Sequence, residues 1–355
     1  MERRVNGAVA PVEKRVGART FRNASVVIPT KNRPHELAVT VLSLLRQSVL
    51  PRELIVVDQS ADRTSRERIE QIYGSLSPEQ REDLKLCYLR EPAISGAATA
   101  RNAAMEIASR EFWVFLDDDV ILEPDFLEQL LDTFSIEPNA AGAGGVITNY
   151  GKRSWLFRFF HWLFMRGPFV DERQHIYLRA DVLREFGLIP VTRLGGGLMA
   201  FRASEVATLR FDSQLCGASE GEDVDFCARL RARGAELYIN PRARLEHKKT
   251  DTARSSDHWV RAEVRGNTYL FRRCWNMGVI NRCCYWWLMF GYSLMAAGTG
   301  LKLRSLAPWR AVRAGMADRK KIQRWQEPQS KLSQTDGTEI RVMDPKDSLG
   351  SRSES

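Results

Sequence analysis

The N-terminal half of the chain alternates short apolar runs with segments of helical periodicity. The run SVVIPT, which begins at Ser25, predicts a buried strand, and the segment after it places Leu37, Val41, Leu44 and Leu45 on one face of a helix. The alternation continues with strands predicted at ELIVVD, LKLCYL and FWVFLD and helices predicted at residues 66–73 and 97–109. Strand and helix in turn predict an α/β fold with a doubly wound, mostly parallel sheet flanked by helices.

Acidic residues stand where predicted strands end. Asp58 ends the strand ELIVVD, and Asp117, Asp118 and Asp119 follow the apolar run FWVFL. Ligands of doubly wound sheets bind beyond the carboxyl ends of the strands. We therefore expect these carboxylates to converge on one crevice.

Changes in composition divide the chain into a central domain and three flanking parts. Residues 1–22 are basic and predicted to be flexible, and residues 23–250 form the α/β domain. An aromatic, basic insertion interrupts this domain at about residues 152–170. Residues 251–325 are predicted to form a helical, membrane-associated extension, and residues 326–355, rich in Ser, Lys, Asp and Pro, a disordered tail.

The overall charge restricts the classes of partner. A composition of 44% hydrophobic and 27% charged residues is typical of a folded protein. The formal net charge of +9 favours anionic partners such as nucleic acid, lipid headgroups or phosphorylated substrates, although a basic surface can also serve solubility alone. The six cysteines show no Cys-x-x-Cys spacing, and the N-terminus lacks the apolar run of a signal peptide. We therefore expect a reducing, cytoplasmic environment.

The three consecutive aspartates, Asp117 to Asp119, indicate a cation site. Adjacent carboxylates repel one another unless a cation or hydrogen bonds offset their charge. Mg²⁺ and Mn²⁺ prefer carboxylate oxygens and commonly keep substrate phosphates in their coordination shell. The alternative is a solvated acidic turn before a helix near Pro124.

No phosphate-binding loop accompanies the first strand. Its continuation, IPTKNRP, contains neither Gly-x-Gly-x-x-Gly nor Gly-Lys-Ser/Thr. A divalent ion would then neutralise most of a bound diphosphate's charge, with help from Arg101 and from Lys31 or Arg33. Arg101 could instead pair with the domain's own carboxylates.

Several segments, in order, resemble the large family 2 of inverting glycosyltransferases, which have the GT-A fold. They are VVIPTKNRP, LIVVDQSADRT, SGAATARNAA, FLDDDV, GGGLMAFR and GEDVDFCARLRARG, and with LEHKKT they cover about residues 25–247. The resemblance implies a GT-A-like fold, a nucleotide-sugar donor, a divalent Mn²⁺ or Mg²⁺ ion, and transfer with inversion to a hydroxyl of a glycan or lipid-linked acceptor.

The resemblance also implies which residues bind the donor and the metal. Asp117 is expected nearer the ribose, whereas Asp119 is expected to bind the metal and bridge to the diphosphate. His247 matches a histidine that closes the metal site in some relatives, although a lone histidine is often structural. The loop DQSAD departs from the commoner family pattern, which leaves the base open. The implied donor-binding residues are Pro29, Thr30, Arg33, Asp58, Arg101, Asp117, Asp118, Gly196 and Gly197; the implied metal ligands are Asp117, Asp119 and His247.

Two acidic residues open a predicted helix, DVDFCARLRARG. Inverting transfer needs one base to accept the proton of the acceptor hydroxyl. By resemblance Asp223 is that base, and Glu222 is its neighbour or an acceptor contact. Carboxylates at a helix N-terminus are also common simply because they suit the helix dipole. The glycines before the strand LMAF permit close approach of a ligand or form a plain turn.

Two segments are suited to a membrane interface. The first, SWLFRFFHWLFMRGPF, interleaves aromatic residues with arginines, a pattern that fits either an interfacial helix or a packed one. The second, residues 283–301, is uncharged but contains Gly, Ser and Thr, so we expect peripheral attachment to the inner face of a membrane rather than a span. Arginines and lysines on both sides would contact anionic headgroups.

Two other functions compete with catalysis. A protein of the same fold could bind nucleotide sugars without turnover, but an intact Asp223 argues against this. A nucleic-acid-binding protein is suggested only by charge, and no recognised motif supports it. We therefore expect a nucleotide-sugar donor, an anionic membrane surface and no nucleic acid as partners.

Overall fold

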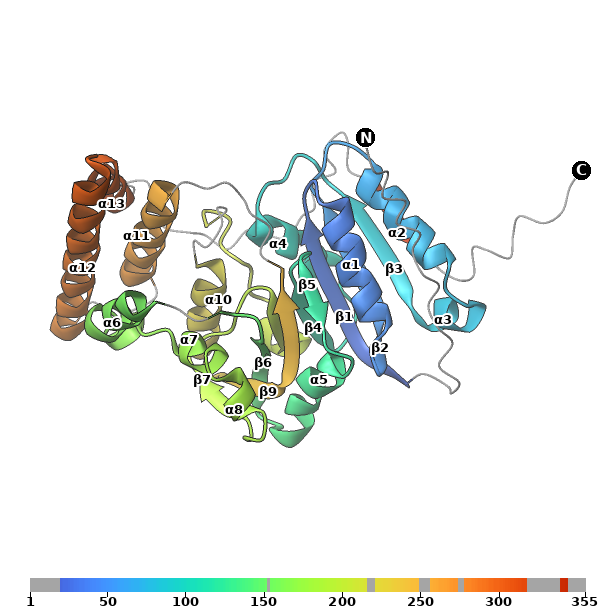
Figure 1. Cartoon of the computed structure of the whole chain (residues 1–355). Coiled ribbons are helices and arrows are strands. Elements are labelled where there is room, and N and C mark those ends of the chain that lie inside the picture. Colours follow the sequence, from blue (N-terminus) through green and yellow to red (C-terminus); the bar gives the residue numbers. More distant parts are fainter. Residues whose placement is uncertain are drawn as a thin grey trace, which may run out of the picture.

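One ten-stranded sheet organises the computed structural model of the chain (Figure 1). The structure describes residues 20–151, 154–215, 221–248, 256–273, 278–317 and 339–343. The strand order is β10-β3-β2-β1-β4-β8-β6-β9-β5, and β7 also pairs with β9. The strands are β1 (Thr20–Thr30), β2 (Val49–Asp58), β3 (Lys85–Arg90), β4 (Phe112–Leu116), β5 (Val120–Leu122), β6 (Ala140–Ile147), β7 (Ile189–Val191), β8 (Leu198–Arg202), β9 (Glu236–His247) and β10 (Glu339–Met343).

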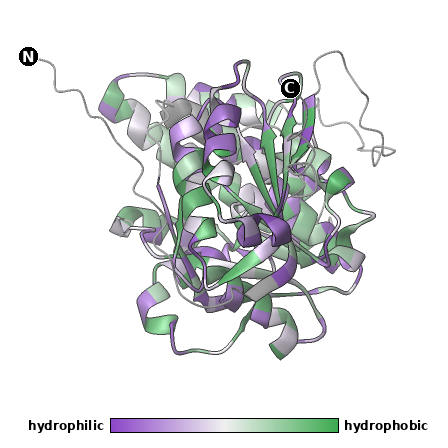
Figure 2. Ribbon diagram, turned by 90° about the vertical axis from the view of Figure 1, so that its right-hand side faces the viewer, coloured by the Kyte–Doolittle hydropathy of each residue, from purple (hydrophilic) through white to green (hydrophobic). Residues whose placement is uncertain are grey.

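The N-terminal half is the predicted α/β unit. Strands β3, β2, β1 and β4 are parallel neighbours, and Thr30 is paired in register with Asp58. The connecting helices are α1 (Pro34–Leu45), α2 (Thr64–Gly74), α3 (Pro78–Asp83), α4 (Ala97–Ile107) and, after β5, α5 (Phe126–Ile136). Figure 2 shows hydrophobic residues along the sheet and a mixture of hydrophobic and hydrophilic residues on the helices around it. The expected α/β fold with flanking helices is confirmed.

The predicted apolar face of α1 lies in the core. Leu37, Val41, Leu44 and Leu45 are each at most 2% exposed. Full burial of one such side chain is worth about 1.5–3 kcal/mol relative to leaving it in water. The helical periodicity of the sequence therefore identified the packed face correctly.

Beyond β4 the sheet becomes mixed. Strand β8 runs antiparallel to both β4 and β6, β9 runs parallel to β6, and β5 and β7 run antiparallel to β9. The insertion between β6 and β8 forms α6 (Trp155–Phe164), the 3₁₀ turn η1 (Gly167–Phe169), α7 (Glu172–Tyr177) and α8 (Ala180–Leu183). After β8 come α9 (Ala203–Val206) and α10 (Glu222–Arg231).

A second hydrophobic core joins the insertion to the C-terminal helices. The helices α11 (Ser256–Arg273), α12 (Val279–Leu303) and α13 (Ala307–Ala317) pack together, and α6 and η1 lie against α12 (Figure 1). Phe169 of η1 is buried against Phe271 and Tyr285, whose rings stack 4.2 Å apart. Among the described helices, none has the length and apolar character needed to cross a bilayer.

The prediction of disorder for the whole tail is wrong for residues 339–343. They form β10, which pairs antiparallel with β3. Glu339 forms ion pairs with Arg63 and Arg66, and Arg341 pairs with Glu70. Without β10, β3 would present an unpaired edge of backbone N–H and C=O groups, and pairing satisfies them. The N-terminal boundary also differs, because β1 begins at Thr20 rather than after residue 22.

Candidate active site

The carboxyl ends of β1, β2 and β4 form one edge, and Asp58 lies fully buried at it. One of its carboxylate oxygens accepts a hydrogen bond from the Ser60 backbone N–H at 2.9 Å, and the other accepts one from the Tyr88 hydroxyl at 2.7 Å. Burial, followed by the hydrogen bond to Asp58, raises the pKa of Tyr88 above its ordinary value. Asp58 is therefore rigidly held beside the end of β1.

Asp118 joins the turn after β1 to the acidic segment. Its oxygens accept hydrogen bonds from Thr30 Oγ1 at 2.7 Å and from Arg33 Nη1 at 3.0 Å. Burial raises the pKa of Asp118 to about 6, with the Thr30 hydrogen bond and the Arg33 charge opposing the rise. Asn32 adopts φ = 56°, the left-handed conformation that the tight turn requires. The middle aspartate therefore anchors the loop that carries Thr30 and Arg33.

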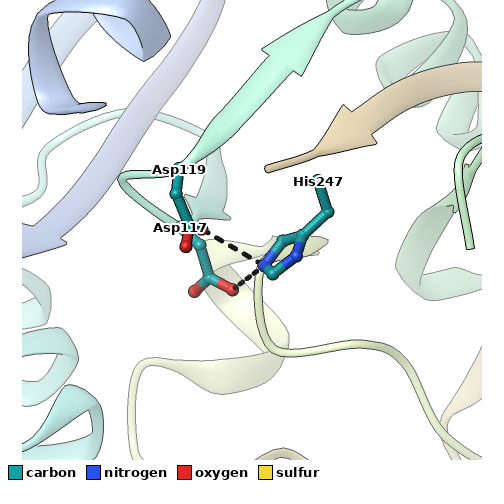
Figure 3. Close-up of side chains that lie close together, drawn as sticks. All are labelled: Asp117, Asp119 and His247. Carbon is teal, nitrogen blue, oxygen red and sulfur yellow. Dashed lines mark ion pairs between the residues drawn. The ribbon is translucent and has the colours of Figure 1, made fainter. Parts of the chain in front are cut away.

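Asp117, Asp119 and His247 converge from separate segments (Figure 3). Pairing of β5 with β9 sets Val120 opposite His247, which brings the imidazole to the acidic segment. Its Nε2 atom lies 3.2 Å from Asp119 Oδ1 and 3.6 Å from Asp117 Oδ2. Contact with Asp117 and then with Asp119 raises the pKa of His247 to about 10. Burial would raise the pKa of Asp117, but the His247 contact and the Arg101 charge outweigh it and lower that pKa.

This cluster has the ligands of a divalent cation site. One atom from each of the three side chains lies within 4.8 Å of the others. Two carboxylates and an imidazole suit a first-row transition ion such as Mn²⁺, and a carboxylate set also accepts Mg²⁺. The two carboxylates raise the pKa of His247 and so favour its protonated form, and a bound cation would take the place of that proton.

Arg101 links this cluster to the start of α10. The guanidinium is 98% buried, and its Nη1 donates to Glu222 Oε1 at 2.9 Å. Its Nη2 donates to the Gly196 carbonyl at 2.9 Å and lies 3.4 Å from Asp117 Oδ1. The sequence left two expectations for Arg101, contact with a bound diphosphate or pairing with the domain's own carboxylates. These contacts directly support the pairing.

The loop before β8 requires glycine because neighbouring side chains approach its backbone closely. A Cβ atom on Gly197 would collide with the Asp117 carboxylate. A Cβ atom on Gly196 would lie 3.2 Å from Arg101 Nη2, closer than most side chains tolerate. The loop therefore fits between the acidic segment and α10 only without side chains.

Asp223 lies on the same side of the sheet as the acidic segment. Gly221, with φ = 87°, is the N-cap of α10 and directly precedes Glu222 and Asp223. The Gly196 backbone N–H donates to Asp223 Oδ2 at 3.2 Å. Gly196 and Arg101 thus connect Asp223 to Asp117. Burial and then the nearby Asp223 charge raise the pKa of Glu222, while Arg101 opposes the rise.

The sequence patterns did not indicate Arg173. This residue of α7 donates Nη1 to Asp223 Oδ2 at 2.6 Å and pairs with Asp171. Both residues follow the aromatic insertion predicted at about residues 152–170, whose pattern indicated either a membrane interface or a packed helix. An arginine and an aspartate two residues apart carry no signal that they belong to a site 50 residues further along the chain.

Comparison with known proteins identifies the family that the chain resembles. Residues 25–194 match the family model described as glycosyl transferase family 2. The succinoglycan biosynthesis protein ExoM of Rhizobium meliloti (strain 1021) is 29% identical over 239 residues, which cover 65% of this chain and 68% of that protein. The glucosyl-dolichyl phosphate glucuronosyltransferase of Haloferax volcanii is 29% identical over 234 residues, covering 63% of this chain and 68% of its own length.

A solved structure shares the fold. The mannosyltransferase PcManGT from Pyrobaculum calidifontis, in complex with GDP-Man and Mn²⁺, superposes with a TM-score of 0.54 at 16% identity. The match covers 84% of this chain and 87% of that one. At this identity the likeness establishes the fold alone.

Proposed function

Residues 25–194 form a glycosyl transferase family 2 domain, and from this premise we propose that the chain is a metal-dependent, inverting glycosyltransferase of cell-surface polysaccharide or glycolipid synthesis. One observation carries the proposal: the carboxylates of Asp117, Asp119 and Asp223, from distant segments, gather on one side of the sheet around Arg101 and the glycine loop. Relatives in polysaccharide and glycolipid assembly support the pathway class.

Asp117, Asp119 and His247 would hold the divalent cation. When bound, such an ion neutralises the diphosphate that departs from the sugar. The nucleoside would lie against Pro29, Thr30 and Asp58 at the ends of β1 and β2. Arg33 and Asp118 shape the wall between this region and the cation site, since Arg33 contacts both Asp118 and Asp119.

Asp223 would act as the base. The acceptor hydroxyl oxygen forms a bond to the anomeric carbon of the donor sugar while the bond from that carbon to the diphosphate oxygen breaks. The hydroxyl proton passes to the Asp223 carboxylate, and the nucleoside diphosphate leaves with the electron pair. Attack opposite the leaving group inverts the anomeric centre. Gly196 and Gly197 let the loop before β8 pack closely between Asp117 and Asp223, so that its backbone would border the donor sugar.

A screen of nucleotide sugars tests the proposal. The full chain is incubated with UDP-, GDP- and dTDP-sugars, with and without Mn²⁺ or Mg²⁺, and both thermal protection and nucleoside diphosphate release are measured. We expect one class of donor to protect and to be consumed only with metal. Protection without consumption for every donor and acceptor would favour a non-catalytic binder of the same fold.

We also propose that the second core docks on an anionic membrane. Exposed aromatic residues lie along α6 and α12, which contact each other through Phe164 and Trp287. The basic residues Arg158, Arg166 and Arg282 are exposed beside them. Apolar rings with interleaved arginines complement an interface of acyl chains and anionic headgroups. The aromatic and aliphatic residues of this membrane face are Trp155, Leu156, Phe159 and Trp162 of α6 and Trp286, Trp287, Phe290 and Leu294 of α12.

Vesicle sedimentation tests this docking. The full chain should sediment with phosphatidylglycerol vesicles and much less with phosphatidylcholine vesicles. Replacing Trp155 and Trp162 with alanine should lower binding several-fold. Phe186→Ala, which removes an exposed ring outside this face, should leave binding unchanged. Equal binding by the tryptophan double variant would contradict the assignment of the face.

A further inference from the structure

Arg173 makes short polar contacts with the candidate base, Asp223, and with two other groups around it. Its Nη1 donates to Asp223 Oδ2 at 2.6 Å and to the Leu194 carbonyl at 2.7 Å. Its Nε and Nη2 donate to the two oxygens of Asp171, each at 2.9 Å. The guanidinium is therefore fixed by a two-pronged carboxylate pair on one side and presents its remaining edge to Asp223.

Asp171 is built to hold this arginine. It caps the N-terminus of α7, where its Oδ1 accepts the Arg173 backbone N–H at 3.1 Å. Burial opposes ionisation of Asp171, but the Arg173 charge outweighs it and lowers the Asp171 pKa to about 2. Asp171 is thus ionised throughout the neutral range and cannot release Arg173 by taking up a proton.

Asp223 accepts hydrogen bonds in a pattern that leaves one direction open. Its Oδ2 accepts from Arg173 Nη1 and from the Gly196 N–H, whereas within the part of the chain that the structure describes its Oδ1 accepts only from the Val224 N–H at 2.9 Å. A carboxylate oxygen has room for further donors. Oδ1 is therefore the atom available to an acceptor hydroxyl, and Oδ2 is the atom by which the protein holds the carboxylate.

Resting on the proposed role of Asp223, we propose that Arg173, oriented by Asp171, is the positioning residue that aims the Asp223 carboxylate. The neighbouring Glu222 shows the same arrangement, since it has its own buried arginine, Arg101. Two adjacent carboxylates at the start of α10 thus have separate cationic partners, and neither has to lose its charge to relieve repulsion.

Arg173 is the cation in direct contact with Asp223, at 2.6 Å. Replacing Arg173 with a neutral residue should therefore remove the contact that sets the direction of the Asp223 carboxylate. The titratable and charged groups that face it are Arg173, Asp171 and Tyr177 from the insertion, Arg193 from the loop before β8, Glu222 and Cys227 on α10, and Glu263 on α11.

The test compares kcat and KM of the full chain and its variants. Nucleoside diphosphate release from the donor identified by the screen is followed with Mn²⁺ at increasing donor concentrations. Arg173→Gln should lower kcat by about 10²-fold, the lower end of the range for proton transfer catalysis, and leave the KM of the donor unchanged. Arg173→Lys keeps the charge without the two-pronged geometry, so it should restore only part of the rate. Affinity for the Mn²⁺ nucleoside diphosphate should not change.

Controls separate positioning from folding. Arg229→Gln removes another arginine paired with a buried carboxylate, Asp225, on α10 itself. It should lower the melting temperature as Arg173→Gln does, yet leave kcat unchanged. An Arg173→Gln enzyme with unchanged kcat, or with a donor KM that rises as kcat falls, would overturn the proposal. Full turnover by Asp223→Asn would instead overturn the role of Asp223 and so the proposed function itself.

Discussion

The candidate site has two ends, the cation cluster and the candidate base Asp223. These two ends offset their negative charge in different ways. At the cation end, Asp117 and Asp119 contact His247, whose proton is exchangeable. At the other end, Asp223 contacts Arg173, whose charge is permanent at any physiological pH. A proton that can be replaced by a metal suits a site that must gain and lose a cation. A permanent cation suits a carboxylate that must be held in one orientation through every turnover.

The difference predicts that metal acts on one end of the site and not on the other. Binding of a cation and diphosphate should depend on pH through His247. The orientation of the Asp223 carboxylate should depend on Arg173 and not on metal. The predictions below test this separation, from the largest expected effect to the smallest.

Asp223→Asn should have the largest effect. The amide cannot take the acceptor proton, so turnover should fall by about 10²–10⁴-fold. Thermal protection by the Mn²⁺ nucleoside diphosphate should stay at the level of the unaltered protein, because the cation end is untouched. A loss of protection equal to the loss of turnover would show that the two ends are not separate.

Asp119→Asn should remove the response to metal. For the unaltered protein, a ligand at one hundred times its Kd stabilises the folded state by about 2.7 kcal/mol. This stabilisation by Mn²⁺ and nucleoside diphosphate should vanish in the variant, as measured by the melting temperature. Glu246→Gln, a nearby change on β9 outside the ligand set, serves as the control and should keep the response.

The dependence of the melting temperature on pH that His247 causes should be a smaller effect than the two above. It should have opposite signs with and without metal. Folding raises its pKa from 6.5 to about 10, so the stability that its proton contributes to the metal-free protein is full below pH 6.5 and is lost as pH rises through about 10. With Mn²⁺ the neutral imidazole is needed, so the rise in melting temperature on adding metal should grow over the same window.

His247→Gln should flatten both dependences. His35→Gln, which changes an exposed histidine on α1, should leave both intact and so controls for the loss of a titrating group. Melting curves at several pH values, with EDTA or with Mn²⁺, measure the two slopes. A metal response of His247→Gln that still grows with pH would remove this residue from the ligand set.

Truncation after residue 338 should have the smallest effect. It removes β10, which pairs with β3 at the edge of the sheet away from Asp223. The melting temperature should fall by about 2–4 °C, the change that about 1 kcal/mol produces in a domain of this size, and turnover should be unchanged. Loss of turnover at constant melting temperature would show that the tail reaches the site.

The cation end was largely predictable because its determinants are local. Apolar runs end at Asp58 and at Asp117, and the parallel arrangement alone brings such ends to one edge. The buried face of α1 follows from spacing along one segment. The resemblance added His247, whose contact with the acidic segment depends on β5 and β9 being neighbours.

The sequence by itself therefore determined the α/β alternation, the acidic edge and the apolar faces, because periodicity and strand ends depend on neighbouring residues. Only the tertiary structure decided which charges meet. Arg101 reaches Glu222 across 121 positions, Arg173 reaches Asp223 across 50, and β10 returns to β3 from the far end of the chain. Local patterns carry no information about such pairs, because a buried arginine selects its carboxylate by the space that the packed elements leave between them.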